Sequence, residues 1–563
     1  MKKYKECPPE ETIARIKSIL THNNIKVKVT KSDNKFFYSC RVDISNDKLK
    51  KIKFGVNGKG MTENYSLASG YAELMEWLQN KFLLVNNSLC FYKHLEKSLI
   101  EANIIDADNR DNNNCLFYNT SKVDFYSVKE KCVKQFSAND FLYQTGSNGF
   151  CAGNTAKEAI THGICEIFER YAVKQISEEK LSLPTIPLDY YKDTKLYKKI
   201  NGLLKQNENI KVIIKDCSLD KGLPVVGVLI IDTENQIYNF QLGSDCNPIV
   251  ATERCFTELY QNTKNIIGEP FLFHREQTKW DVDRIIGYGS GQWPISIFSE
   301  NTDFSFNPNS QFYSNEIEND LEYCVKIVND FRCDIYIRDN SFLGFPTYYV
   351  VIPGMSMKKN NRILTDKCLF QSDLFSKLDY ISKEELLRLT TELENEYNKI
   401  NSLDIIFDIT KHIPINTNDE LNELDFDLFL ALSMYKLELY DKFIFYMDKF
   451  LKDKNKKEYV YFWVAYNFVL LHQIQKQDIK SATSILSKCY GDELVKEVIN
   501  DMINPYEIFK YYKLPSYPNC SQCKLKKDCR VDDVVQICLD LRKKEASANI
   551  DQWKLAEVFD FET

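Results

Sequence analysis

The sequence predicts an α/β domain built from repeated strand, loop and helix units, followed by an all-helical region and a cysteine-rich tail. Short segments rich in Val, Ile, Tyr and Phe occur up to about residue 380 and have β character. From 381 to 504 apolar residues recur at helical spacing, and Pro414 is the only proline. We therefore expect domains at 1–380 and 381–505 and a tail at 506–563.

The composition is that of a packed globular protein. The 563 residues are 44% hydrophobic and 27% charged, and the formal net charge is −7. An acidic balance gives no chain-wide footprint for direct nucleic-acid binding. The N-terminus carries glutamates where a signal peptide would be apolar, and polar residues interrupt the apolar windows before they could span a bilayer. We expect a cytoplasmic protein without membrane contact.

The expected strands of the first domain are bounded by Gly, Asn, Asp or Pro. They lie at 26–30, 36–42, 224–232, 236–242, 334–338 and 348–353. In the helical region, 426–439, 441–451 and 458–473 are successive segments with short gaps. They could form antiparallel pairs of the tetratricopeptide kind, although no strict 34-residue consensus is present.

An internal repeat is the most informative feature of the chain. Five positions of one copy recur in a second copy at a constant offset of 93 residues. They are Gly60, Thr62, Gly70, Glu73 and Glu76, matched by Gly153, Thr155, Gly163, Glu166 and Glu169. A looser third copy contains Gly243, Asn247, Arg254, Glu258 and Gln261.

Each copy joins a glycine-containing loop to a helix. Thr62 or Thr155 can cap that helix, and the Glu-x-x-Glu spacing places two carboxylates on one helix face. Glycine loops and helix N-termini bind phosphate oxygens, and carboxylates on rigid helices can coordinate Mg²⁺ beside them. A nucleoside triphosphate site is one interpretation. The alternative is that the glutamates are solvated and the repeat only records a duplication.

The second copy resembles the signature of the YcaO family. The resemblance rests on SNGFCAGNT at 147–155, EA at 158–159 and GICEIFERY at 163–171. GKG at 58–60 with the glutamates that follow is similar to the first glutamate helix of the family, and 243–261 is similar to the third. The resemblance extends over roughly residues 1 to 400.

This resemblance implies an enzyme that uses ATP and Mg²⁺ without a P-loop to activate a peptide amide. A substrate side chain or a sulfide adds to the carbonyl, and the resulting oxyanion is phosphorylated and then eliminated. Azolines, thioamides or amidines result. No enzyme nucleophile is required, and the chain has no convincing Ser-His-Asp or Cys-His arrangement. His162 and Cys165 are interpreted as an incidental histidine and a buried cysteine.

The resemblance also assigns roles by matching position. The expected Mg²⁺ ligands are Glu73, Glu166, Glu169 and Glu258. The expected nucleotide contacts are Lys5, Thr12, Glu76, Cys151, Asn154, Glu158, Arg170 and Arg254. The residues expected to carry catalysis are Glu166, Glu169, Arg254 and Glu258.

Two positions depart from the family pattern, and so does the end of the chain. Trp77 replaces an arginine, and Cys151 replaces a small hydroxyl residue. Residues 558–563 lack the Pro-x-Pro-x-Pro ending of azoline-forming members. The chain therefore resembles the stand-alone bacterial members, which are linked to β-methylthiolation of a small-subunit ribosomal protein by a radical-SAM methylthiotransferase.

Other functions remain open within this resemblance. One is a peptide-modifying cyclodehydratase or thioamide-forming enzyme, and another is a non-catalytic nucleotide-binding accessory protein. The expected partners are ATP, a peptide or protein substrate and the methylthiotransferase, with a homodimer left open.

The tail contains cysteines at the spacing of a metal site. Cys520, Cys523, Cys529 and Cys538 could bind zinc or an iron–sulfur cluster. Cys489 is an alternative to Cys538 as the fourth ligand. The other interpretation is a set of reduced structural thiols.

Overall fold

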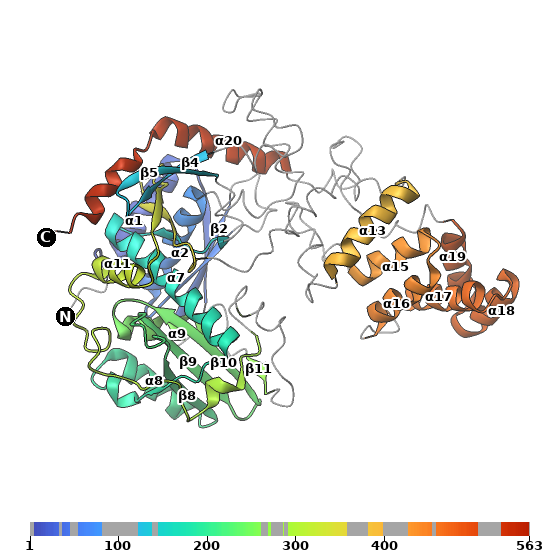
Figure 1. The fold of residues 1–563 in the computed structure, drawn as a ribbon, viewed down its shortest axis with the longest axis horizontal. Helices are drawn as coiled ribbons and strands as arrows, with labels where there is room; N and C mark the ends of the chain where they lie inside the picture. The colour runs from blue at the N-terminus through green and yellow to red at the C-terminus, as the bar shows by residue number, and fades with distance from the viewer. Residues whose placement is uncertain are drawn as a thin grey trace. The chain divides into compact units, whose positions relative to one another are not determined.

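The computed structural model describes most of the chain in twelve stretches. They are 5–32, 36–45, 55–80, 122–137, 145–260, 268–271, 285, 291–356, 381–397, 426–452, 458–504 and 531–561. The chain divides into two compact units (Figure 1): 1–85, 96–360 and 533–563 form the first, and 86–95 with 361–532 form the second. The C-terminal segment thus groups with the first unit, whereas the sequence analysis placed it in a tail. The three domain boundaries given above stay predictions.

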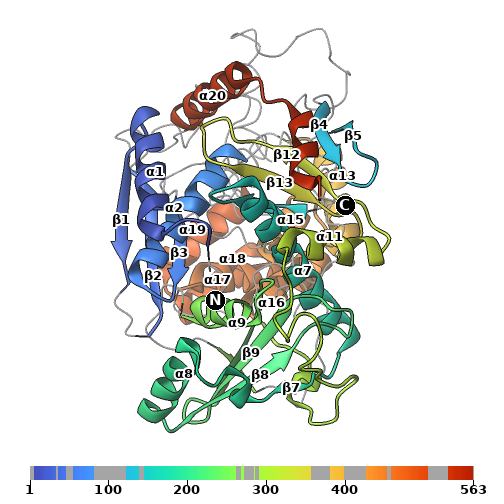
Figure 2. The ribbon, with the colours of Figure 1, turned by 90° about the vertical axis from the view of Figure 1, so that its left-hand side faces the viewer.

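The first unit begins with a small antiparallel sheet covered by two helices (Figure 2). Its strands, in the order β1-β2-β3, are β1 (Val27–Lys31), β2 (Tyr38–Ile44) and β3 (Gly55–Gly60). Helix α2 (Glu63–Gln79) packs on β2 and β3, and α1 (Pro9–His22) packs on α2. The strands predicted near the N-terminus are confirmed.

The second sheet is fully antiparallel in the order β11-β10-β9-β8-β7. Its strands are β7 (Thr185–Ile186), β8 (Ile210–Asp216), β9 (Val225–Asp232), β10 (Ile237–Ser244) and β11 (Glu269–Pro270). Helix α9 (Pro248–Leu259) packs on β9 and β10, and α8 (Lys195–Gln206) precedes β8. The strands predicted at 224–232 and 236–242 are confirmed.

The third sheet is assembled from distant parts of the chain, in the order β5-β4-β12-β13-β6. Its strands are β4 (Lys122–Ser127), β5 (Cys132–Ser137), β6 (Phe150–Ala152), β12 (Tyr336–Asp339) and β13 (Thr347–Val351). Helix α7 (Ala156–Glu179) contacts β6 and β13 of this sheet and also β9 and β10 of the second sheet. This central position explains why α7 is buried on several faces. Helix α11 (Asp320–Asp330) packs on α7.

The C-terminal segment packs against the third sheet. It consists of α20 (Val531–Ala548) and the 3₁₀ helix η4 (Gln552–Phe559), and η4 contacts β4, β5 and β12. The Asp339 amide donates to Gln552 Oε1 at 2.7 Å, and Gln552 Nε2 donates to the Asp339 carbonyl at 3.0 Å. These two bonds tie η4 to β12.

The second unit is helical in its described residues, as the sequence predicts. Its elements are α13 (Lys383–Tyr397), α15 (Phe426–Lys436), α16 (Tyr440–Leu451), α17 (Val460–Val469), the π-helix η3 (Leu470–Ile474), α18 (Ile479–Tyr490) and α19 (Asp492–Ile503). Their core includes Phe429, Phe443 and Phe468. The tetratricopeptide interpretation is not confirmed.

Two further expectations bear on the described residues. No helix among them has the length and apolar character needed to cross a bilayer. Of the expected metal ligands in the tail, Cys520, Cys523 and Cys529 lie outside the described residues, and Cys538 falls within α20. The alternative ligand Cys489 is exposed at the end of α18. The metal site of the tail therefore stays a prediction.

Candidate active site

The three sequence repeats fold into three similar units in which a strand runs through a loop into a capped helix. Thr62 Oγ1 accepts from the Tyr65 amide at 3.3 Å at the start of α2, and Thr155 Oγ1 accepts from the Glu158 amide at 3.2 Å at the start of α7. Asn247 Oδ1 caps α9 in the third unit. The predicted threonine caps are confirmed, and side-chain caps of this kind fix where each helix begins.

Close packing between strand and helix recurs in all three units. At the contact, at most one of the two facing residues has a side chain, because a second Cβ would clash. The facing pairs are Gly58 and Gly70, Cys151 and Gly163, and Gly243 and Cys255. The offsets of 93 and 92 residues therefore reflect a repeated packing constraint as well as repeated glutamates.

The three units surround one cavity of about 520 Å³. Every residue that the sequence analysis assigned to magnesium or nucleotide lines this cavity, with the exception of Cys151. The lining members are Lys5, Thr12, Glu73, Glu76, Asn154, Glu158, Glu166, Glu169, Arg170, Arg254 and Glu258. Helices α1, α2, α7 and α9 therefore bring together residues that are up to about 250 positions apart in the chain.

Carboxylates from α2 and α7 crowd one part of the cavity. The pKa of Glu73 is raised to about 7, mainly by burial; the charge of Lys59 lowers it and that of Glu166 raises it. Burial also raises the pKa of Glu76 well above its usual range, and that of Glu169 is raised for the same reason. Such a set of poorly solvated oxygen donors matches the ligands of a hard divalent cation.

Lys59 is one of the cations that the structure places among these carboxylates, together with Arg170 and Arg254. Its ammonium group pairs with Glu258, which links β3 to α9. Burial lowers the pKa of Lys59, while the charges of Glu169 and Glu73 act in the opposite direction. The sequence analysis did not assign Lys59 to the site. Its position within the GKG motif of the first repeat was the available signal.

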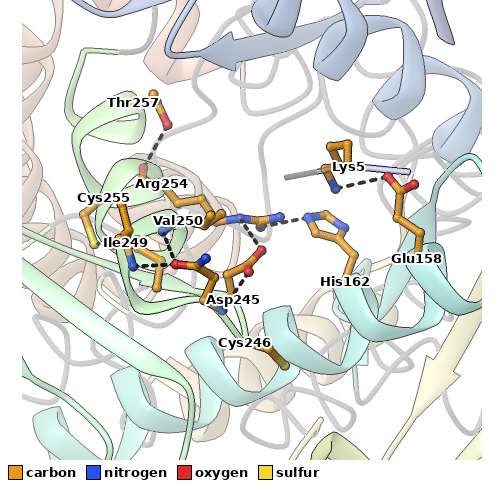
Figure 3. A network of polar contacts seen from close by, with 12 residues as sticks. Lys5, Glu158, His162, Asp245, Cys246, Ile249, Val250, Arg254, Cys255 and Thr257 are labelled. Atoms are coloured by element: carbon orange, nitrogen blue, oxygen red, sulfur yellow. Dashed lines mark hydrogen bonds and ion pairs between the residues drawn. The ribbon is translucent and has the colours of Figure 1, made fainter. Parts of the chain in front are cut away.

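A second polar group lies where α1 meets the start of α7. Lys5 Nζ is 3.2 Å from Glu158 Oε1 (Figure 3), and Asn154 Nδ2 donates to Glu158 Oε2 at 3.2 Å. Thr12 Oγ1 donates to Asn154 Oδ1 at 2.8 Å. The structure therefore brings Lys5 and Thr12, near the N-terminus, to the SNGFCAGNT motif at 147–155. Arg15, which the sequence analysis missed, donates to the Asn154 carbonyl at 3.0 Å.

Arg254 extends from α9 toward α7 and contacts two partners (Figure 3). Its guanidinium lies 2.8 Å from His162 Nε2 and 3.8 Å from Asp245 Oδ2. Burial lowers the pKa of His162 well below its usual range, with Arg254 adding to the effect, so the imidazole is neutral and Nε2 accepts from Arg254. Burial raises the pKa of Asp245 to about 6, against the effect of Arg254.

His162 is therefore a cavity residue, and its interpretation as incidental needs correction. The signal was available, because 158, 162, 166 and 169 lie on one face of a helix. The position 92 residues after His162 is Arg254, so the two contacting residues occupy matching places in the second and third repeats. The sequence did not predict that Asp245 would contact Arg254.

Cys151 also needs correction. The structure does not bring it into the cavity; its side chain is fully buried against Gly163, and its Sγ lies 3.5 Å from the Tyr348 carbonyl. The neighbouring Ala152 and Gly153 line the cavity instead. Because β6 is pleated, successive side chains point to opposite faces, and Cys151 points into the core. Gln261, from the third repeat, lies outside the described residues.

Residues 57–356 match the model of the family described as YcaO cyclodehydratase, ATP- and Mg²⁺-binding. The ribosomal protein S12 methylthiotransferase accessory factor YcaO of Escherichia coli is 30% identical over 218 residues, which are 37% of this chain and 36% of that protein. An uncharacterized protein of Haemophilus influenzae is 29% identical over 220 residues, with the same coverage. The match thus spans little more than a third of these relatives' length.

Two solved structures are similar at lower identity. The structure of YcaO from Methanopyrus kandleri bound with AMPPCP and Mg²⁺ has a TM-score of 0.41 and 15% identity, covering 62% of this chain and 92% of that one. A heterocyclase in complex with substrate and cofactor has a TM-score of 0.44 and 18% identity, covering 62% of this chain and 53% of that one.

Proposed function

The chain belongs to the YcaO family, and on that premise we propose that it binds ATP with Mg²⁺ in the cavity and activates a peptide amide by phosphorylating its oxygen. The main support is the convergence of three capped helices, carrying both carboxylates and guanidinium groups, on one cavity. This combination suits a nucleotide triphosphate with its metal, because the metal needs oxygen donors and the phosphates need cationic donors.

The Mg²⁺ ligands in this proposal are Glu73, Glu166, Glu169 and Glu258. They come from all three helices of the repeat and line the same cavity. When bound, Mg²⁺ would neutralise charge on the phosphates during phosphoryl transfer. The ammonium of Lys59 already sits against Glu258, so this region accommodates positive charge.

The phosphate contacts are Arg170 and Arg254. A guanidinium presents a planar set of donors that matches phosphate oxygens in pairs. His162 and Asp245 hold Arg254 from the side of α7 and from the loop before α9, and this restricts its orientation. Glu76, which lines the same cavity, is also proposed to contact the nucleotide.

Lys5, Thr12, Asn154 and Glu158 would contact the remaining part of the nucleotide. They already form one hydrogen-bonded group at the start of α7.

The reaction needs no nucleophile from the protein. A nucleophile of the substrate adds to the amide carbon, and the carbonyl oxygen then takes the γ-phosphoryl group from ATP, which leaves as ADP. The carbon–oxygen bond then breaks and phosphate leaves with that oxygen, while the protons of the nucleophile and the amide nitrogen are released as the new double bond to carbon forms. The role of this chain is to hold the nucleotide and the oxyanion together and to stabilise the charge that develops between them.

We further propose that the acceptor is a ribosomal protein and that the chain acts in the cytoplasm with a radical-SAM methylthiotransferase. The support is the name and 30% identity of the Escherichia coli relative over 218 residues. A peptide-modifying enzyme of the cyclodehydratase or thioamide-forming kind is the alternative that the family description supports.

Calorimetric titration of the full chain with ATP tests the binding step, with and without Mg²⁺. Glu166→Gln should weaken Mg²⁺-dependent ATP binding by about 10- to 100-fold, the range seen when a group supporting a metal is lost. Glu179→Gln is the matched control, because Glu179 is exposed at the far end of the same helix. Unchanged affinity in Glu166→Gln would contradict the assignment.

Turnover is tested separately by measuring ADP formation with a candidate acceptor. Addition of the ribosomal protein should raise the rate of ADP formation, and Arg254→Lys should lower it. Tight ATP binding without stimulated turnover by any acceptor would instead support a non-catalytic accessory role.

A further inference from the structure

Three buried cysteines from separate elements lie close together in the first unit. Cys165 lies on α7, Cys246 lies in the loop between β10 and α9, and Cys324 lies on α11. Their Sγ atoms all lie within 4.8 Å of one another, and Cys246 Sγ is 3.6 Å from Cys324 Sγ. Each residue is at most 2% exposed. The repeats did not indicate this cluster, because the three cysteines lie on separate elements.

The spacing of the sulfur atoms matches a mononuclear thiolate site. Thiolates around one tetrahedral zinc lie about 3.8 Å apart, because each Zn–S bond is about 2.3 Å long. A disulfide would bring two sulfur atoms to about 2.05 Å, and all three cysteines are free.

Oxygen donors lie beside the sulfur atoms. The Ser244 hydroxyl is fully buried and lies close enough to the Cys165 thiol to interact with it. Cys246 Sγ also lies 3.6 Å from the Asp320 carbonyl.

We propose that Cys165, Cys246 and Cys324 bind one Zn²⁺ ion and that the remaining position is open to the Ser244 hydroxyl. Three thiolates and Zn²⁺ carry a net charge of −1, and the Arg254 guanidinium is close enough to act on Cys165. This site is distinct from the proposed Mg²⁺ site, which uses oxygen donors alone, and it does not depend on ATP binding.

The ion would tie together elements that position the cavity residues. Cys165 directly precedes Glu166 on α7. Cys246 follows Asp245, which contacts Arg254 (Figure 3), and it precedes Asn247, which caps α9. A metal held by α7, by the loop before α9 and by α11 would fix the carboxylates of α7 relative to the guanidinium of α9. Its role is therefore structural.

Metal analysis of the full chain, purified under reducing conditions, tests the proposal. Replacing Cys246 and Cys324 together with serine should remove one equivalent of zinc. Replacing Cys520 and Cys523 with serine is the control for the predicted site in the tail, and it should leave that equivalent in place. Full zinc content in the Cys246→Ser, Cys324→Ser double variant, or no zinc in the tail control, would overturn the proposal.

Cobalt provides a second readout that does not depend on activity. The tail control, loaded with Co²⁺, should show thiolate-to-cobalt charge transfer and tetrahedral ligand-field bands, and Cys324→Ser should weaken them. If the double variant does not fold, alkylation of the tail control decides the question. Zinc should protect Cys165, Cys246 and Cys324 from alkylation until a chelator is added. Equal labelling with and without chelator, or a disulfide between Cys246 and Cys324, would overturn the proposal.

Discussion

Gly163 on α7 lies directly against Cys151 on β6: a Cβ atom at Gly163 would stand 2.7 Å from Cys151 Sγ and 3.0 Å from its Cβ. In the third repeat the cysteine and glycine exchange places, with Gly243 on the strand and Cys255 on the helix. The contact accepts one small side chain and no more. This close approach fixes the distance between strand and helix, and so it fixes where the glutamates of the helix lie in the cavity.

Gly163→Ala should destabilise the first unit by about 1–3 kcal/mol, because the added methyl group overpacks a rigid contact. Urea denaturation followed by tryptophan fluorescence measures this loss. Cys151→Gly in the same chain should restore much of it, since the pair would then have the arrangement of Gly243 and Cys255. Gly202→Ala is the control, because the nearest atom that its Cβ would meet among the described residues is Phe36 Cε1 at 3.5 Å. A destabilisation that Cys151→Gly does not relieve would contradict this account.

Lys59→Met removes the cation that pairs with Glu258. We expect a loss of about 1 kcal/mol without metal, since both side chains are partly exposed to the cavity and solvent screens them. Mg²⁺ alone should then raise the melting temperature of Lys59→Met more than that of the parent chain. The surface pair of Lys31 and Glu63 supplies the control, Lys31→Met. Equal Mg²⁺ shifts in Lys59→Met and the parent would count against competition between the lysine and the metal.

Glu253 should make stability depend on pH. Burial raises its pKa to about 7, with Lys199 acting in the opposite direction. Because the folded-state pKa exceeds the unfolded value of about 4.3, stability is lost as pH rises from about 4.5 through 7. Glu253→Gln should therefore gain about 1–2 kcal/mol over the parent at pH 8 and little at pH 4.5. Urea midpoints at both pH values measure this, with Glu179→Gln as control. An equal gain at both would exclude titration of Glu253 as the cause.

Gln552→Ala tests the contribution of the C-terminal segment. The substitution removes both hydrogen bonds to the Asp339 backbone and should cost about 1–3 kcal/mol, because buried polar groups lose their partners. Denaturation of the full chain measures the change. The exposed neighbour variant Lys554→Ala should stay within about 0.5 kcal/mol of the parent. A similar result for Gln552→Ala would show that η4 adds little to the first unit.

Much of the candidate site could be predicted because its signals are local and repeated. The cap, the glycine at the strand–helix contact and the glutamates on one helix face occur at fixed spacing within each unit. Cys151 was assigned wrongly because its neighbours belong to the motif while its own side chain points into the core. The role of His162 was not predicted because its partner, Arg254, lies on another helix and meets it only in the folded structure.

The sequence by itself determined the repeated strand, loop and helix units, the helical second region and the helix-face glutamates that line the cavity. Short-range spacing specifies these features, because caps and helix faces depend on residues a few positions apart. The tertiary structure alone decided that Thr12 contacts Asn154 and that Lys59 pairs with Glu258. It also decided that η4 packs against the third sheet and that three cysteines converge. Each such contact joins residues tens to hundreds of positions apart. Periodicity in the chain depends on near neighbours and therefore cannot predict which distant residues will meet.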